Sequence, residues 1–177
     1  MNLKTVFDVM AYAQANGFTP TATRGILTHA NARLLKPYTI FSGNVTAAAI
    51  EAARTMRGEY VGHTLIVEHP EKMQRGLTDW VRDNVLNDYD AFEREVRRLS
   101  TVNIATRLEN AALSQKDATY ESLGITLVAW ADIPADVQRL LYIHCIGKRC
   151  GNHADFTPGR QHEPAEGGQA VSRGQAA

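Results

Sequence analysis

The chain has few cysteines, no long apolar run and no excess of charge of one sign. It contains only two cysteines, Cys145 and Cys150, so the disulfide framework of small secreted domains is excluded. No apolar run approaches the ~20 residues that a membrane-spanning helix needs. The N-terminal residues also lack the apolar core of a secretory signal peptide. These absences predict a cytoplasmic protein with no membrane contact.

Charge is balanced over the chain as a whole. Lysine and arginine together number 19, as do aspartate and glutamate. No global basic charge favours a nucleic-acid partner, so DNA binding would need a local basic patch. With 177 residues, of which 44% are hydrophobic, the chain can bury one core, or one core with a small helical appendage.

One stretch in the first half has the pattern of a strand, a helix and a second strand. Residues 38–41 combine aromatic and β-branched side chains and are followed by Ser42 and Gly43, which is typical of a buried strand that ends in a turn. Ser42 or Asn44 could then cap an alanine-rich helix. Residues 64–67 supply a second apolar strand. The pattern predicts a βαβ-type unit.

The predicted turn at Gly43 also has the chemistry of a weak anion site. The first N–H groups of a helix point out of its N-terminus and could hold a phosphate together with the Thr46 hydroxyl. A purely structural turn is the alternative, because an isolated glycine motif is weakly specific.

The remaining periodicity is helical. Apolar residues at helical spacing predict helices at 3–15, 73–85 and 90–99, and then only helices as far as residue 148. Within that last part, Ser100 or Thr101 could cap a helix running to about residue 108. Residues 154–177 contain almost no large apolar side chain, so they are predicted to be disordered.

In this order the motifs resemble the ParB family of partition proteins, whose N-terminal domain is similar in fold to sulfiredoxin. The matching segments are Asn16-Gly17, Pro20, Tyr38-Thr39-Ile40 with Gly43, residues 64–67, residues 83–87 and residues 133–138. The likeness covers roughly residues 5–148. It implies an α+β fold, in which a small mixed sheet with helices is followed by an all-helical helix-turn-helix segment. The implied units are a ParB/sulfiredoxin-like domain at 1–87, a helical domain at 88–150 and a disordered tail at 151–177.

The chain departs from the family at the nucleotide motifs. Where the family has arginines after the glycine, this chain has valine and threonine, and the arginine of the second motif is replaced by Asn87. Nuclease or nucleotide-hydrolase activity thereby loses its phosphate-binding guanidinium groups, and sulfiredoxin chemistry loses its cysteine. The resemblance therefore implies no catalytic residue and no cofactor beyond a weakly held nucleotide. It does imply a weak anion or nucleotide site made of Gly43, Asn44, Val45, Thr46 and Asn84.

The resemblance also implies DNA binding through two helices, at 109–117 and 120–131. The second would face the base edges, yet it contains neither lysine nor arginine, so neighbouring cations would have to contact the phosphates. The candidate DNA-binding residues are Arg94, Arg97, Arg98, Arg107, Lys116, Tyr120, Ser122 and Thr126.

Two functions remain open from the sequence. The first is a plasmid- or phage-type ParB-like protein that binds double-stranded DNA in partition or regulation, without nucleotide hydrolysis and compatible with a homodimer. The second is a protein of the same fold that acts by protein–protein contact, as a plasmid fertility-inhibition or anti-defence factor would, because an apolar recognition helix suits a protein partner. No metal site is predicted, since the spacing of His144, Cys145, Cys150 and His153 matches no common zinc motif.

Overall fold

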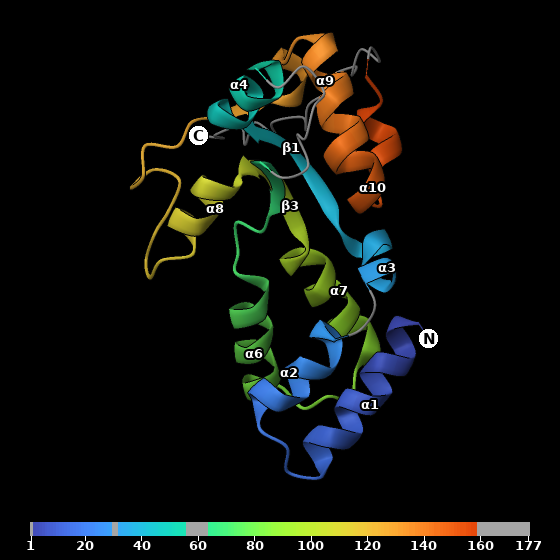
Figure 1. Ribbon diagram of the computed structural model, residues 1–177. Coiled ribbons are helices and arrows are strands. Elements are labelled where there is room, and N and C mark those ends of the chain that lie inside the picture. Colours follow the sequence, from blue (N-terminus) through green and yellow to red (C-terminus); the bar gives the residue numbers. More distant parts are fainter. Residues whose placement is uncertain (1, 30–31, 56–63, 159–177) are drawn as a thin grey trace, which may run out of the picture.

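The structure, a computed structural model, describes residues 2–29, 32–55 and 64–158 (Figure 1). It is an α+β protein, as the sequence predicts. The helices are α1 (Leu3–Ala15), α2 (Pro20–Thr28), α3 (Ala32–Leu35), α4 (Ala47–Thr55), α6 (Met73–Asp83), α7 (Tyr89–Leu99), α8 (Arg107–Leu113), α9 (Ala135–Leu141) and α10 (Gly147–Arg149). The strands are β1 (Ile40–Thr46), β2 (Leu65–Glu68), β3 (Thr101–Thr106) and β4 (Leu127–Ala129). Short 3-10 turns occupy Lys36–Tyr38, Trp130–Asp132 and His153–Phe156, and a π-helical turn, Tyr142–Ile146, joins α9 to α10.

The four described strands form one sheet in the order β2-β3-β1-β4. Strand β1 runs parallel to β3, while β2 and β4 run antiparallel to their neighbours. The register places Glu68 opposite Asn103, and Asn44 opposite Ala129. Strands from both sides of the predicted domain boundary at residue 87 therefore share one sheet.

Helices α1, α2, α6 and α7 pack together beyond one end of β1 and β3, and we call them the helical body (Figure 1). Helix α1 spans the predicted residues and is capped by Asn2, whose side chain accepts from the Thr5 N–H at 2.9 Å. The centre of this body is the buried ring of Phe92, which lies 5.2 Å from the ring of Phe7 and 6.0 Å from that of Trp80. Its interior is predominantly apolar.

The sheet packs with α4 and α9 around a second core, and we call this part the sheet body. Phe41 of β1 is at its centre and makes edge contacts with Trp130 at 5.7 Å and Phe156 at 4.7 Å between ring centroids. Val102 and Ile104 of β3 are completely buried in the same core. None of the described helices is long and apolar enough to cross a bilayer.

The prediction of helices throughout 100–131 is wrong. Residues 101–106 form the central strand β3 instead of a capped helix. Val102, Asn103, Ile104 and Ala105 are all buried, so both faces of β3 are covered and the alternation of burial that marks a half-exposed strand is absent. A run of six residues, Thr-Val-Asn-Ile-Ala-Thr, is too short for periodicity alone to separate a buried strand from a helix.

The predicted helix-turn-helix is likewise absent. Helix α8 ends at Leu113, well before residue 117, and residues 120–131 contain turns, strand β4 and a 3-10 turn in place of a recognition helix. Gly124 has a φ of +64°, which interrupts any helix there, and Leu127, Val128 and Ala129 pair as β4 with β1. The all-helical character predicted for 88–150 is therefore wrong.

The predicted βαβ-type unit is also wrong. Gly43 does not end the strand, because β1 continues to Thr46 with an irregularity in its pairing between Phe41 and Val45, where Gly43 has a φ of +90°. Thr46, and neither Ser42 nor Asn44, caps α4 by accepting from the Ala49 N–H at 3.2 Å. Strand β3 lies between β1 and β2, and β2 runs in the opposite direction to β1.

The segment directly after α10 is part of the fold, so the predicted tail begins too early. The Asn152 side chain accepts from the Phe41 N–H and donates to the Phe41 carbonyl, both at 2.9 Å, as a neighbouring strand would. The Gly151 N–H donates to the Thr39 carbonyl at 2.8 Å. A Cβ on Gly151 would lie 2.6 Å from the Pro37 carbonyl oxygen, so this approach requires glycine. The rest of the predicted tail, 159–177, lies outside the described residues.

Candidate functional site

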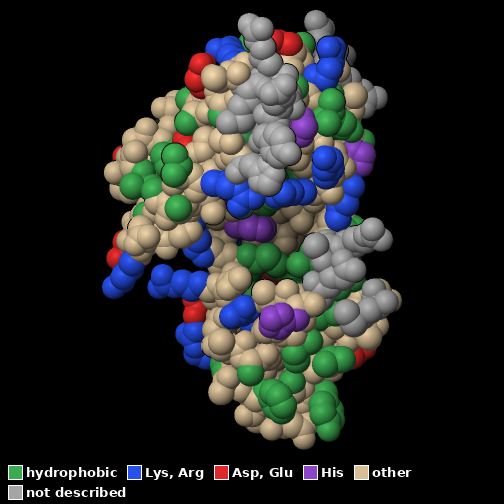
Figure 2. Space-filling model, viewed as in Figure 1, with side chains coloured by type: hydrophobic (Ala, Val, Ile, Leu, Met, Phe, Trp, Pro, Cys, Tyr) green, Lys and Arg blue, Asp and Glu red, His purple; other side chains and the backbone are tan. Residues whose placement is uncertain are grey.

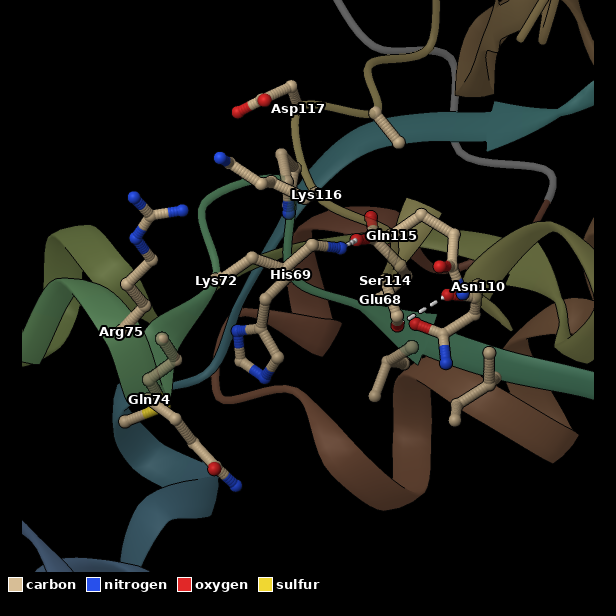
Figure 3. Close-up of a pocket in the computed structure, with 15 residues that line it drawn as sticks. Glu68, His69, Lys72, Gln74, Arg75, Asn110, Ser114, Gln115, Lys116 and Asp117 are labelled. Carbon is tan, nitrogen blue, oxygen red and sulfur yellow. Dashed lines mark hydrogen bonds and ion pairs between the residues drawn. The ribbon is translucent and has the colours of Figure 1, made fainter. Parts of the chain in front are cut away.

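A pocket of about 760 Å³ lies where the helical body meets the sheet (Figure 3). One wall comes from the end of β2 and the start of α6, and the other from α8 and the turn that follows it. Ile66, Val67 and Met73 provide apolar lining, and Gln74 and Asn110 provide amides. The volume falls within the ~300–1,000 Å³ that is usual for small-molecule sites. We call this the basic pocket because of the cations described next.

Three cations from two separate segments line the basic pocket. Lys72 directly precedes α6, Arg75 lies in its first turn, and Lys116 comes from the turn after α8. Lys72 lies 3.2 Å from Glu68, whereas Arg75 and Lys116 form no ion pair within the described part of the chain. In Figure 3 Arg75 and Lys116 are directed to the same side, while Lys72 points across to Glu68. Asp117 is the nearby acidic residue at the rim.

Basic side chains are abundant around the junction of the two bodies. Figure 2 shows Lys and Arg side chains gathered around the waist of the molecule, between the sheet and the helical body. The chain has no net charge, so this concentration is local. A concave site with uncompensated cations attracts anions more strongly than the same charges spread over a convex surface.

His69 contributes a neutral imidazole to the pocket lining. Its Nδ1 lies 3.0 Å from the Leu99 carbonyl oxygen, an acceptor only, so Nδ1 carries the proton and Nε2 is left as the basic nitrogen. Burial lowers the pKa of His69, and the hydrogen bond to Leu99 opposes this only in part. The pocket therefore owes its positive charge at neutral pH to lysine and arginine.

A row of hydrogen-bonded polar side chains crosses the sheet behind the pocket; Asn103 and Glu68 are buried, Tyr120 is half-buried and Ser42 is exposed. Asn103 of β3 stands at its centre, donating to the Tyr120 hydroxyl at 2.9 Å and accepting from the Ser42 hydroxyl of β1. The Tyr120 hydroxyl in turn donates to Glu68 of β2. We call Ser42, Asn103, Tyr120 and Glu68 the polar row. Burial, and then the hydrogen bond to Glu68, raise the pKa of Tyr120, so its hydroxyl keeps its proton.

Glu68 links the polar row to the basic pocket. Its side chain is only 1% exposed, yet it lines the pocket and ends an otherwise apolar strand. One carboxylate oxygen accepts from Tyr120 and the other from the Lys72 ammonium. A buried carboxylate is costly unless it is paired and hydrogen-bonded, and these two partners meet that requirement.

The segment 114–126, between α8 and β4, forms part of the pocket wall and is ordered mainly by polar bonds. Asp117 and Gly124 adopt left-handed backbone conformations near its two ends, with φ of 59° and 64°. Asp and Gly tolerate this region better than most residues. Between them Thr119 and Ser122 exchange side-chain to backbone hydrogen bonds. Tyr120 then anchors the segment to the polar row.

The predicted anion site at Gly43, Asn44, Val45 and Thr46 is not supported by the structure. The Thr46 hydroxyl donates to the Glu109 carboxylate at 2.7 Å while it accepts from the first turn of α4. The place foreseen for a phosphate is therefore taken by a carboxylate of the chain itself. The Glu109 carboxylate also accepts from the Thr106 N–H at 2.9 Å and completes a capping box for α8.

Asn84, the other predicted member of that site, belongs to the helical body. Its side chain donates to the Trp80 carbonyl at 2.9 Å, and its own carbonyl accepts from Gln14 at 2.8 Å. These bonds fasten the end of α6 to α1. The structure therefore does not bring Asn84 to the β1–α4 junction, and the prediction that joined the two places is wrong.

The predicted DNA-binding arginines of α7 are mostly neutralised by carboxylates. Arg97 pairs with Glu93 at 2.8 Å and its guanidinium stacks over the Tyr38 ring at 4.8 Å. Arg98 pairs with Glu95 at 2.7 Å and also with Glu71. The remaining arginines of the prediction, Arg94 and Arg107, are exposed and form no ion pair within the described residues.

The other predicted DNA contacts do not share one helix. Lys116 lines the basic pocket, and Tyr120 is bonded to Glu68 and Asn103, so it cannot reach a base edge. Ser122 is engaged in the turn with Thr119. Thr126 precedes β4, and its carbonyl accepts from the Ala47 N–H at 2.9 Å. Of this group, Lys116 alone lines the basic pocket.

Both cysteines are buried thiols. Burial raises the pKa of Cys145 to about 11 and that of Cys150 to about 12. His153 accepts from or donates to the Tyr142 hydroxyl at 3.1 Å. In the described ranges no three His, Cys, Asp or Glu side chains are grouped so that they could hold a metal ion.

Sequence reasoning missed most of the residues that form the site. Glu68 could have been noticed, because a glutamate directly after Leu65-Ile66-Val67 is unusual in a buried strand. Asn103 is not conspicuous in the sequence, because a polar residue is ordinary in the helix that the pattern predicts for its segment. Lys72 and Arg75 look like ordinary exposed helix residues, and only the fold shows that Lys116 faces the same pocket.

No protein-family model, curated protein or solved structure matches the chain. The fold and the site together define an α+β protein with a basic pocket backed by a partly buried polar row.

Proposed function

We propose that the protein binds DNA through its phosphates at the basic pocket, in a regulatory or partition-related role. The observation that supports this most strongly is the convergence of Lys72, Arg75 and Lys116 on one concave site, with no ion pair to Arg75 or Lys116 in the described part of the chain. Lysine and arginine contacts to phosphate supply most of the affinity in non-specific DNA binding. Such contacts need neither a recognition helix nor a basic chain overall.

The proposed mode of binding is phosphate positioning with little base reading. The residues once assigned to a recognition helix are built into turns and the polar row, so they have no free edge to present to the bases. The amides of Gln74 and Asn110 line the pocket and could add contacts to sugar or base atoms. The protein should therefore bind many duplexes with similar affinity and respond strongly to salt.

Fluorescence anisotropy with a short labelled duplex at low salt tests the proposal. Replacing Arg75→Gln together with Lys116→Gln should weaken binding roughly tenfold, because two phosphate contacts are lost. Arg97→Gln is the matched control, since that guanidinium is already paired with Glu93 and should change affinity little. Equal affinities for the wild type and the double variant would contradict the proposal, as would no binding to any duplex.

A protein partner is the second candidate, and one observation favours it. The stretch 107–129 exposes large apolar side chains at Leu108, which is 84% exposed, and at Leu123 and Leu127. Strand β4, which contains Leu127, is at the edge of the sheet. Exposed apolar residues at a sheet edge suit contact with another protein, or with a second copy of this chain. A stoichiometric partner that survives nuclease treatment and is lost in Leu108→Ser would favour this function over DNA binding.

A further inference from the structure

We propose that Glu68 is a built-in competitor for the anion that the basic pocket binds, and that its bond to Tyr120 couples ligand binding to the segment 114–126. This inference rests on the proposed phosphate binding. It further proposes that Glu68 sets the affinity of the pocket for phosphate, and that the segment 114–126 responds when a ligand binds there.

The competition follows from what surrounds Lys72. Its ammonium lies 3.2 Å from a carboxylate oxygen of Glu68, and no other ion pair to Glu68 occurs among the described residues. Glu68 is buried, so it depends on this counter-charge far more than an exposed carboxylate would. A phosphate in the pocket would need donors from the same ammonium. Glu68 therefore opposes every anion that enters, both by holding Lys72 and by its own negative charge.

The coupling follows from the second oxygen of Glu68. That oxygen accepts from the Tyr120 hydroxyl. When a ligand draws on Lys72, the carboxylate is less neutralised and becomes a stronger acceptor for Tyr120. Occupation of the pocket should therefore tighten the bond that anchors the segment 114–126.

The ligand would also contact that segment directly. Lys116 lies within it, four residues before Tyr120, and lines the same pocket. A bound phosphate would thus join the segment to α6 at Lys116 and strengthen its anchor at Tyr120, so both effects act in the same direction. Because coupling between two events is reciprocal, weakening the anchor must weaken ligand binding.

The far end of the polar row keeps Tyr120 in place. Asn103 donates to the Tyr120 hydroxyl at 2.9 Å, and its own oxygen accepts from Ser42, whose hydroxyl accepts from the Asn44 N–H at 3.1 Å. Every polar atom along this line has a partner, which leaves the Tyr120 proton directed at Glu68. The Tyr120 hydroxyl has no alternative acceptor in the row, so a change in the charge around Glu68 changes the strength of its hydrogen bond to Tyr120.

Two substitutions, one at each end of the Glu68–Tyr120 hydrogen bond, separate the competition by Glu68 from the coupling to the segment 114–126. Glu68→Gln removes the charge but keeps a carbonyl acceptor for Tyr120, so the labelled duplex should bind roughly fivefold to tenfold more tightly. Tyr120→Phe keeps the charge but removes the hydroxyl, so Glu68 relies more on Lys72 and the duplex should bind more weakly. Circular dichroism spectra of both variants should match that of the wild type.

Hydrogen exchange on the unmodified protein gives a readout that needs no substitution. Adding the duplex should slow amide exchange in the segment 114–126 and leave the far helix α1 unchanged. The inference is overturned if Glu68→Gln binds no more tightly than the wild type while Arg75→Gln with Lys116→Gln weakens binding, or if exchange in 114–126 does not respond to saturating duplex. If the wild type binds no duplex, the proposed function itself is contradicted.

Discussion

The helical body and the sheet body have interiors of different kinds. The helical body is closed by aromatic and aliphatic packing around Phe92, whereas the sheet body has the polar row of Ser42, Asn103, Tyr120 and Glu68 beside its apolar core. Packing of the first kind stabilises a fold and does little else. Asn103 and Glu68 are buried polar groups, which are costly unless hydrogen-bonded, so a bonded row that contains them and ends at a basic pocket points to a functional role for this part of the molecule. Three predictions test this contrast.

The largest expected effect is on the helical body. Phe92→Ala removes the ring at the centre of its core and should lower the free energy of unfolding by roughly 3–5 kcal/mol. Chemical denaturation measures the loss. The exposed Leu108→Ala is the control and should stay within about 0.5 kcal/mol of the wild type. A small loss in Phe92→Ala would mean that this body is not held together by its aromatic core.

A smaller effect is expected when the polar row is cut at its centre. Asn103→Ala removes the buried amide that joins the Ser42 and Tyr120 hydroxyls, and the loss of these two hydrogen bonds should cost roughly 1–3 kcal/mol of stability. Asn110→Ala, on a partly exposed side chain that makes no hydrogen bond in the described part of the chain, is the matched control. If both variants unfold at the same denaturant concentration, the row is not an energetic unit.

The smallest effect concerns pH. The pKa of His69 is lower in the folded protein than the ~6.5 of an unfolded histidine, so below that pH the unfolded chain binds more protons and stability falls. His69→Gln, whose amide can still donate to the Leu99 carbonyl, should lose less stability than the wild type between neutral and mildly acidic pH. The difference between the two denaturation profiles isolates this residue. Parallel profiles would show that His69 is not held neutral by the fold.

The sequence predicts three of the four helices of the helical body, missing α2, and it predicts the sheet body poorly. Helices α1, α6 and α7 each have one buried and one exposed face, and that amphipathic pattern is visible along the chain. Strand β3 is only six residues long and is buried on both faces, so periodicity does not separate it from a helix. The false helix-turn-helix has a separate origin, because its helices at 109–117 and 120–131 are implied by the family resemblance and lie outside β3.

The pocket itself could not be found from local patterns. Lys72 and Lys116 are far apart in the chain, and they meet only because α8 follows the central strand β3 while α6 follows the edge strand β2. The predicted anion site failed for a similar reason, since the carboxylate that occupies it comes from Glu109 on another element. Contacts of this kind depend on the order of the strands, which periodicity does not encode.

The salt dependence of duplex binding tests the central claim most directly. For the wild type, the logarithm of affinity should fall linearly with the logarithm of salt concentration, and in Arg75→Gln with Lys116→Gln the slope should be shallower by about two, since each phosphate contact contributes roughly 0.9. Slopes that are equal in the two proteins would place the contacts elsewhere and contradict phosphate binding at the basic pocket.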